Sequence, residues 1–299
     1  MAEFLQYLIS GLAQGATYAL VALGFALIFG VSNILNIAHV ETIMLAPAFT
    51  VILSTKAHLS SVLAVVTAFL LTVVAAVVMH GVAVQPFLNR RRGSGAMLAP
   101  LIATFGVSIF VENALAKQIG TAGAPFPLHV PTTVWHLSGG TLVAPMAVVT
   151  IVVTLVLMIA LGLLITRADF GRSMRAVAEN GTVARSLGIS ITRTILMATI
   201  IAGALGAIAG LLFSAATNSV TPTMGLDYGL IGLVALVIGG VTKLGGAVIA
   251  ALGIGIVQAM STGYLSSSYT TPITFAVMIL FLIARPQGVF AGASREARP

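Results

Sequence analysis

The sequence contains no cysteine, and this absence excludes disulfide bonds and metal sites built on thiolates. Charged residues are almost as scarce. They make up 7% of the 299 residues, whereas a soluble domain carries roughly 25%. A chain of this size with so little charge cannot cover itself with a polar surface. Hydrophobic residues make up 59% of it, so we expect an integral membrane protein embedded in the lipid bilayer.

Long apolar runs recur along the whole chain, and a helix needs roughly 20 mainly apolar residues to cross a bilayer. We therefore expect an all-α polytopic fold of eight or nine transmembrane helices in a single domain, residues 1–299. The expected spans are 5–29, 34–53, 61–84, 97–116, 143–165, 195–216, 228–241, 246–263 and 270–284. The seventh is short for a full crossing, which leaves the count open between eight and nine. The start of the chain lacks a basic region, so we expect the first apolar segment to remain as a helix.

Basic residues orient these spans, because cytoplasmic loops of membrane proteins are enriched in lysine and arginine. If the seventh segment crosses, the N-terminus is outside, the C-terminus is cytoplasmic, and 12 of the 14 basic residues share the cytoplasmic side. Only Lys56 and Lys117 then fall outside. The cytoplasmic basic residues are Arg90, Arg91, Arg92, Arg167, Arg172, Arg175, Arg185, Arg193, Lys243, Arg285, Arg295 and Arg298.

The most polar stretch is the loop 166–194, between the fifth and sixth spans. Its pattern predicts a short helix from Arg172 to Asn180, a break at Asn-Gly, and a second short helix that Thr182 caps and Gly188 ends. Ser190 or Thr192 then caps the next membrane helix. Two interpretations remain open: a solvated connector, and a rigid element that docks into a groove on a cytoplasmic partner.

Polar residues interrupt the second span, where Asn36 and His39 lie three apart and share a helical face. Glu41 points elsewhere unless the helix is broken here, and Gly30, Ser32 and Asn33 just before it are residues that can hold an irregular entry. A metal site is disfavoured, because too few ligands accompany them. Ionisable residues inside a membrane often mark ion paths, and polar groups also hydrogen-bond neighbouring helices. We expect these residues at a helix junction near the cytoplasmic end of this span, either holding helices together or lining a path.

The first span carries a second polar set, because Gln6, Ser10, Gln14 and Thr17 form one stripe along a helix. Such a stripe does not face lipid, so it packs against another helix or lines a cavity. Close helix packing is predicted by two G-x-x-x-G pairs, Gly11 with Gly15 and Gly206 with Gly210. Near the outer end of the fourth span, Glu112 and Lys117 are expected either to form an interfacial charge pair or to extend toward the membrane surface at the end of the helix.

Five motifs, in order, resemble bacterial branched-chain amino acid ABC transporter permeases of the first permease subunit type. The motifs are GLAQGATYALVALGFALIFGVSNILNIAHVE (11–41), LIATFGVSIFVEN (101–113), MRAVAENGTVARSLGI (174–189), GLVALVIGGVTKLGGAVIAALGIG (232–255) and RPQGVF (285–290). Together they cover nearly the whole chain. The third of them corresponds to the family's cytoplasmic coupling segment.

This resemblance implies a multi-pass permease of the bacterial inner membrane that transports branched-chain or related amino acids and is not an enzyme. It implies a second homologous permease, two ATPase subunits and a periplasmic substrate-binding protein as partners, and no nucleic acid. ATP binds the ATPases, and this chain, which has no G-x-x-x-x-G-K-[ST] motif, is expected to bind no cofactor. The residues that the resemblance assigns to ATPase coupling are Arg172, Arg175, Glu179, Arg185 and Gly188.

Two other functions remain open from the residues alone. An ion-coupled secondary transporter of a small polar solute would depend on His39 or Glu41 and would work without an ATPase. A membrane scaffold without transport would not need the polar stripe, so replacing Gln14 by leucine would leave it unaffected.

Overall fold

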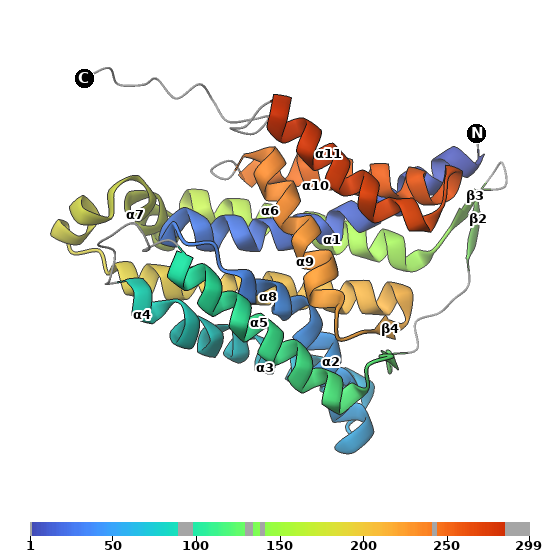
Figure 1. Ribbon diagram of the computed structural model, residues 1–299, viewed down its shortest axis with the longest axis horizontal. Coiled ribbons are helices and arrows are strands. Elements are labelled where there is room, and N and C mark those ends of the chain that lie inside the picture. Colours follow the sequence, from blue (N-terminus) through green and yellow to red (C-terminus); the bar gives the residue numbers. More distant parts are fainter. Residues whose placement is uncertain (1, 89–97, 129–133, 138–140, 241–243, 285–299) are drawn as a thin grey trace.

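The computed structural model describes residues 2–88, 98–128, 134–137, 141–240 and 244–284, and these form a bundle of long helices (Figure 1). The helices are α1 (Ala2–Ser32), η1 (Ile37–Val40), α2 (Glu41–Lys56), α3 (Ser61–Ala83), α4 (Gln85–Leu88), α5 (Leu98–Ile119), α6 (Pro145–Arg167), α7 (Asp169–Ser186), α8 (Ile191–Thr217), α9 (Met224–Gly239), α10 (Leu244–Tyr264), η2 (Ser267–Tyr269) and α11 (Thr270–Ala284). The polytopic, helical class expected from the sequence is therefore confirmed.

Seven described helical segments are long and apolar enough to cross a bilayer, counting η1 and α2 as one. Two further apolar helices are shorter: α9 has 16 residues and α11 has 15. The segment expected at 228–241 is α9, which begins four residues earlier, at Met224. Because helix length alone does not decide whether α9 and α11 cross, the count of eight or nine crossings and the side of each terminus stay predictions.

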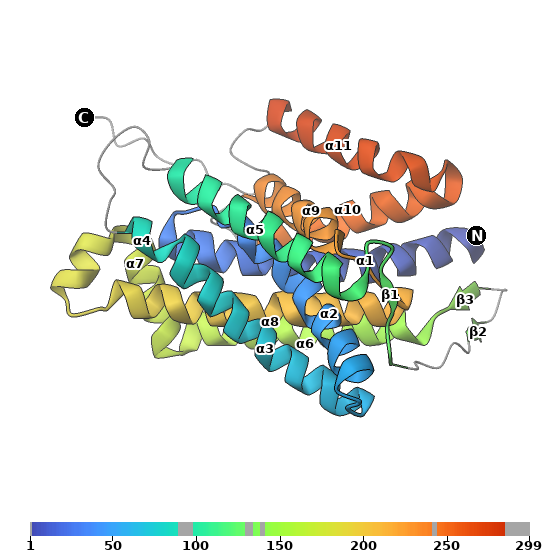
Figure 2. The ribbon, with the colours of Figure 1, turned by 60° about the horizontal axis from the view of Figure 1, so that its bottom comes forward.

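Helix α1 lies at the centre of the bundle and packs against α10, α8, α9 and α6. Its contact with α10 is close because the expected G-x-x-x-G pair removes two side chains from the interface. A Cβ atom built at Gly11 would lie 2.7 Å from the Cα of Ile256, and one at Gly15 would lie 2.7 Å from the Cα of Leu252. The small residues thus let two backbones meet, as the sequence predicts. At the edge of the bundle, α11 packs on α10 (Figure 2).

The second glycine pair lets α8 approach α2 in the same way. A Cβ at Gly206 would overlap the hydroxyl of Thr42, and one at Gly210 would overlap the carbonyl oxygen of Ile43. Helix α3 covers the neighbouring face of α8 in antiparallel orientation, with Ala76 opposite Gly203 and His80 opposite Thr199. These contacts hold α2 in the interior of the bundle.

The lysine and arginine side chains within the described residues lie at two opposite ends of the bundle. Arg167, Arg172, Arg175, Arg185 and Arg193 lie on α7 and the flanking ends of α6 and α8. Lys56 and Lys117 lie at the other end, where Lys56 donates a hydrogen bond to Gln118. The positive-inside rule uses such an unequal distribution of basic residues to orient a membrane protein. The remaining basic residues used for orientation, Arg90, Arg91, Arg92, Lys243, Arg285, Arg295 and Arg298, lie outside the described residues.

The long loop after α5 contains short antiparallel strand pairs. Strand β1 (Ala124–Pro125) pairs with β4 (Ser219–Val220), and β2 (Trp135–Leu137) pairs with β3 (Thr141–Val143). The sequence predicts this region, 117–141, as irregular, and two- or three-residue strands give too little periodicity to be seen there. The β1–β4 pair ties this loop to the connection between α8 and α9.

Candidate functional site

A break in the helical backbone separates α1 from α2 and returns the chain to the interior of the bundle. Asn33 has a positive φ of 54°, and residues 33–36 are not helical. The N–H of Ile34 bonds the Ser32 hydroxyl at 3.1 Å, and the N–H of Ile37 bonds the Thr104 hydroxyl of α5 at 3.2 Å. These side-chain acceptors replace the helical bonds that the break removes, because unpaired backbone groups are costly in an apolar interior.

The break places His39 and Glu41 near mid-depth in the bundle. Glu41, the first residue of α2, accepts a hydrogen bond from Ser108, which lies close to the midpoint of α5. His39 and Glu41 lie at a helix junction at the start of the second span, Ile37–Lys56, and the side of the membrane that this end faces stays a prediction. The sequence assigns 34–53 to one helix, whereas the extended segment carries the chain inward before α2 begins at Glu41.

His39 fills a space between α1 and α8. Its imidazole occupies the position of a side chain at Gly24 and meets the ring of Phe25 edge-on, with centroids 4.9 Å apart. Asn36 and His39 are 5% and 3% exposed and line one void of about 10 Å³, which also touches Thr199. That volume is about the size needed for one water molecule. The structure thus brings Asn36 and His39 together, as their spacing predicts.

Glu41 faces different helices from His39. It is fully buried, its Oε1 accepts the bond from Ser108, and its Oε2 has no hydrogen-bond donor among the described groups. The carboxylate lies against Gly225 in the first turn of α9, where an added Cβ would be 2.9 Å from Oε2. Within the described residues, no group of three histidine or acidic side chains is placed to hold a metal ion.

The polar stripe on α1 leads toward this junction. Ser10 and Gln14 are exposed, Gln6 is half-buried, and Thr17 is buried with its hydroxyl on the carbonyl of Ala13 at 3.3 Å. Val21 and Gly24 lie four and seven residues after Thr17, so they continue the same face of α1. These two residues contact Gly232 of α9 and His39, respectively. One face of α1 therefore connects exposed polar side chains to the buried junction.

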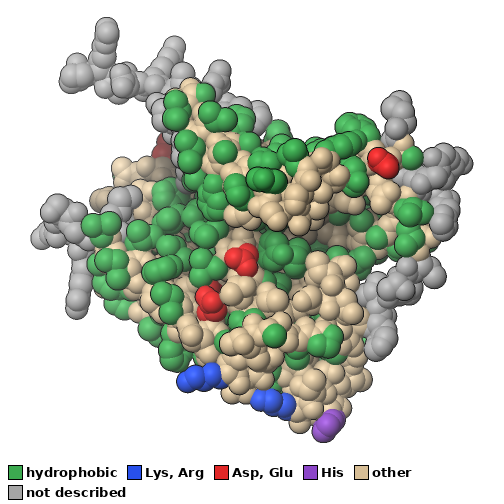
Figure 3. All heavy atoms as spheres, turned by 45° about the vertical axis from the view of Figure 1, so that its right-hand side comes forward, with side chains coloured by type: hydrophobic (Ala, Val, Ile, Leu, Met, Phe, Trp, Pro, Cys, Tyr) green, Lys and Arg blue, Asp and Glu red, His purple; other side chains and the backbone are tan. Residues whose placement is uncertain are grey.

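Carboxylates also lie on an outer face beside the junction. Glu112 of α5 is half-buried and lies one helical turn beyond Ser108, which bonds Glu41. Asp227 of α9 is exposed and lies two residues after Gly225, so it points to a different side of α9 from the glycine against which Glu41 packs. Acidic side chains appear among hydrophobic ones in the middle of this face (Figure 3). Glu112 and Lys117 do not form the charge pair that was one of the two expectations for them, because the ion pair found in the described part of the chain is Arg172 with Asp169. The other expectation, that they extend toward the membrane surface, stays a prediction.

The polar loop between α6 and α8 forms α7, a helix with one kink. The kink is at Asn180 (φ −155°, ψ 100°), and the Asn180 side chain accepts hydrogen bonds from the N–H groups of Thr182 and Val183 at 3.0 and 3.1 Å. Asn180, rather than Thr182, therefore caps the second half. The break at Gly188 is as expected, with φ of 84°, and Ser190 caps α8.

Helix α7 is held to the bundle by Arg175, Gly171 and two buried apolar residues, Met174 and Val177. The Arg175 guanidinium donates to the carbonyl of Ile165, and a Cβ at Gly171 would overlap the same carbonyl. Arg175 thus fixes α7 to the end of α6.

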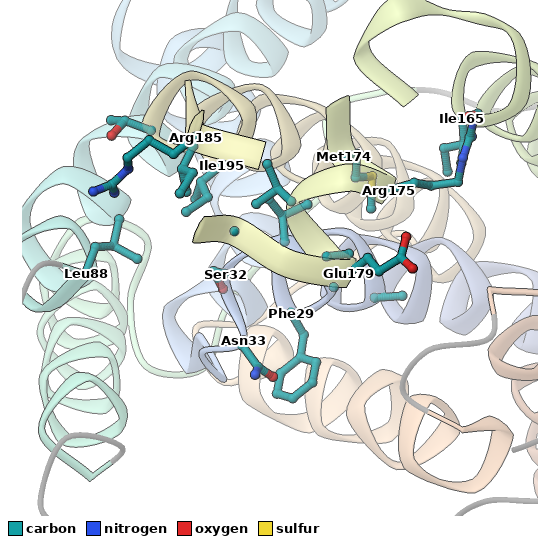
Figure 4. Close-up of a pocket in the computed structure, with 18 of the residues that line it drawn as sticks. Phe29, Ser32, Asn33, Leu88, Ile165, Met174, Arg175, Glu179, Arg185 and Ile195 are labelled. Carbon is teal, nitrogen blue, oxygen red and sulfur yellow. The ribbon is translucent and has the colours of Figure 1, made fainter. Parts of the chain in front are cut away.

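The other coupling candidates on α7 lie at its surface. Arg172 pairs with Asp169, and Glu179, Arg185 and Gly188 are exposed. Arg185 and Glu179 line a cavity of about 870 Å³ between α7 and the ends of α1 and α8, and they point to opposite sides in Figure 4. Two exposed apolar residues here, Val183 at 53% and Leu187 at 74%, are not among the residues predicted from the sequence. The signal that marks them is an apolar residue within a polar loop.

Comparisons with known proteins agree with this architecture. The family described as "Branched-chain amino acid transport system / permease component" matches residues 7–282. The chain is 31% identical over 297 residues to the high-affinity branched-chain amino acid transport system permease protein LivH of Escherichia coli, covering 96% of this chain and 95% of that protein.

Two further relatives give the same result. The chain is 30% identical over 293 residues to the permease protein BraD of Pseudomonas aeruginosa, a high-affinity branched-chain amino acid transport component, with coverage of 96% and 95%. It is 25% identical over 283 residues to a probable LivH of Methanocaldococcus jannaschii, with coverage of 90% and 87%. No solved structure matches the chain.

Proposed function

The chain belongs to the family of branched-chain amino acid transport system permease components, and from this we propose that it forms, with a second homologous permease, the translocation path of an ABC importer. The importer resides in the bacterial inner membrane and carries leucine, isoleucine, valine or a related amino acid. Two ATPase subunits bind and hydrolyse ATP, and a periplasmic binding protein delivers the substrate. This chain contributes helices and breaks no bond.

The observation that carries the path is the connection between exposed and buried polar groups along one face of α1. Ser10 and Gln14 are exposed, and the same face reaches His39 at the helix break. Amides and hydroxyls suit a zwitterion, because they hydrogen-bond either charged group without holding it strongly. A broken helix beside this face offers backbone that rearranges when the bundle opens, as in discontinuous helices of other transporters.

Helix α7 is the element through which the ATPase acts. Its attachment through Arg175 and Gly171 is rigid, so a push on α7 reaches α6 directly. Its far half exposes Val183, Leu187 and Arg185, which offers an apolar contact with a charged rim. Glu179 and Arg172 lie on the same helix, Gly188 follows its end, and these three exposed residues complete the docking surface.

A second candidate function is an ion-coupled secondary transporter, and the buried carboxylate of Glu41 favours it. Its Oε2 lacks a donor among the described groups, which suits a group that binds a proton or a cation during transport. This function requires uptake by the chain alone, without ATP.

Purification of the chain from its native membranes in gentle detergent separates the two functions. Mass spectrometry of the bound proteins is expected to find a second permease and two copies of an ATPase. A chain that purifies alone, remains folded, and reconstitutes solute uptake without ATP would contradict the importer and support the second candidate.

A further inference from the structure

We propose that the void beside Asn36 and His39 binds one water molecule, which bridges the helix break to α8. The void has a volume of about 10 Å³, and side chains of α1, η1, α2, α3 and α8 line it. Such a water belongs to the fold of this chain. Its presence does not depend on which solute the transporter carries or on what drives the transport.

The side chain of Asn36 is directed to the void instead of capping a helix. Asn36 is the N-cap residue of η1, but its side chain makes no capping hydrogen bond there. Asparagine is a preferred N-cap, because its side-chain oxygen usually accepts a bond from the first helical turn. Here the side chain lines the void, and its Oδ1 is buried without a donor among the described groups. Because a buried amide oxygen without a hydrogen bond is costly, the void is where its donor is expected.

The threonine hydroxyls that line the void have already used their protons. Thr42 donates to the carbonyl of His39 at 2.7 Å, and Thr199 donates to the carbonyl of Ile195 at 3.0 Å. Each hydroxyl oxygen keeps lone pairs that can accept a further bond. A water molecule has two hydrogens, one for Oδ1 of Asn36 and one for a threonine oxygen, so it completes both sides of the void.

The size and the polarity of the void select water as the occupant. A volume of about 10 Å³ is roughly one probe sphere, the least that a water molecule needs. A bound water also needs roughly two to four polar partners, and Asn36, Thr42 and Thr199 supply three. No acidic residue, lysine or arginine is among the described residues that line the void, so it offers no charge to hold an ion.

The water joins η1 to α8, the helix that follows α7 in the chain. The Thr199 hydroxyl also lies 3.4 Å from Nδ1 of His80, which extends the polar contacts to α3. A bridging water is nearly as favourable as a direct hydrogen bond, and it can exchange one partner for another. A shift of the break relative to α8 would therefore exchange water contacts and would not leave the buried amide of Asn36 unpaired.

The first experiment is a cryo-EM map of the protein in lipid nanodiscs, together with whatever proteins it carries from its native membrane. The resolution must be high enough to show ordered waters elsewhere in the bundle. We expect a density peak in the void within about 3 Å of Oδ1 of Asn36. A map that shows this side chain and other buried waters, but no peak in the void, would overturn the proposal.

The second experiment detects the water chemically, by X-ray radiolysis and mass spectrometry. Brief irradiation converts bound water to hydroxyl radicals, which oxidise neighbouring methionine to the sulfoxide. Met79 of α3 lines the void, and Met44 of α2 is the matched control, because it is fully buried and does not line the void. We expect Met79 to be oxidised several-fold faster than Met44 in the wild type.

The variant Asn36→Leu shows whether Asn36 holds the water. Leucine has a similar size and no hydrogen-bonding group, so oxidation of Met79 should fall to the rate of Met44. Equal rates for Met79 and Met44 in the wild type would contradict a bound water, and this comparison does not require the variant to fold. Fast oxidation of Met79 that persists in a folded Asn36→Leu variant would contradict the bridge through Asn36.

Discussion

The imidazole of His39 occupies the place on α1 where Gly24 has no side chain. This contact fixes the position of η1, and through it the start of α2, against the central helix. We predict that Gly24→Ala lowers stability by about 1–3 kcal/mol, because an added methyl group in a packed interior forces its neighbours to shift. Thermal unfolding of the detergent-purified protein, followed by size-exclusion chromatography, measures the change.

The control for this substitution is Gly162→Ala in α6, where an added Cβ meets nothing within 4 Å. Alanine is preferred to glycine in a helix interior by about 0.5–1 kcal/mol, so this variant should be slightly more stable than the wild type. Equal effects of the two substitutions would show that His39 does not pack against Gly24 as described.

The hydrogen bond from Ser108 to Glu41 ties α5 to the first residue of α2. Ser108→Ala leaves a buried carboxylate without its donor, and we predict a loss of about 1.5–3 kcal/mol, as for other bonds to charged groups. Ser60→Ala is the matched control, since Ser60 is exposed and its side chain makes no capping bond. A Ser108→Ala variant that unfolds at the wild-type temperature would contradict the bond.

Gly171 has no room for a side chain, because a Cβ would overlap the Ile165 carbonyl that Arg175 also binds. We predict that Gly171→Ala displaces α7 and uncouples the complex, so that ATP hydrolysis continues while uptake falls several-fold. Gly181→Ala, on the same helix, adds a Cβ that meets only the tip of Ile191 at 3.4 Å and should keep the wild-type ratio. The readout is leucine transported per ATP hydrolysed. A normal ratio in Gly171→Ala would show that this attachment does not transmit motion.

Leu187 is 74% exposed at the end of α7, which is unusual for a leucine in a polar loop. If an ATPase buries it, Leu187→Ser should weaken ATPase binding roughly tenfold, given the 1.5–3 kcal/mol that burying a leucine contributes. Leu265→Ser is the control, because Leu265 is 68% exposed at the opposite end of the bundle. Binding of the purified ATPase to the permease is measured by biolayer interferometry. Similar affinities for both variants would place the ATPase elsewhere.

Gln14 is an exposed member of the polar stripe on α1. We predict that Gln14→Leu reduces leucine uptake several-fold without lowering the amount of complex in the membrane, because the path loses a hydrogen-bonding group. Unchanged uptake at normal expression would show that the stripe does not line the path. The stripe would then serve helix packing, or the chain would be a scaffold without transport.

The sequence predicts much of this architecture because hydrophobic length and small-residue spacing are local signals. Hydrophobic length predicts the spans near α3, α6 and α8. Glycine spacing predicts the close contact made by Gly11 and Gly15, and the turn residues predict the breaks at Asn180 and Gly188. The family is also recognisable from ordered motifs, and the comparisons confirm it.

The sequence indicates only in part the break before α2: Ser32 and Asn33 are residues that allow an irregular backbone, but nothing local fixes where α2 begins. Residues 33–40 are mostly apolar, so the pattern from Ile34 onward predicts a continuous helix. In the structure, the Thr104 hydroxyl of α5 accepts a hydrogen bond from the backbone of Ile37, and His39 occupies the space left by Gly24 on α1. Both partners are distant in sequence. For the same reason, nothing in the sequence places Ser108 beside Glu41, because their contact depends on how α5 packs against α2.

ATP-dependent uptake of L-leucine by the reconstituted complex tests the account most directly. The complex contains this chain, its co-purified permease and ATPases, and the binding protein. We predict uptake that requires both internal ATP and external binding protein, and that stops when the ATPase subunits are removed. Uptake by this chain alone, driven by an ion gradient without ATP, would contradict the account.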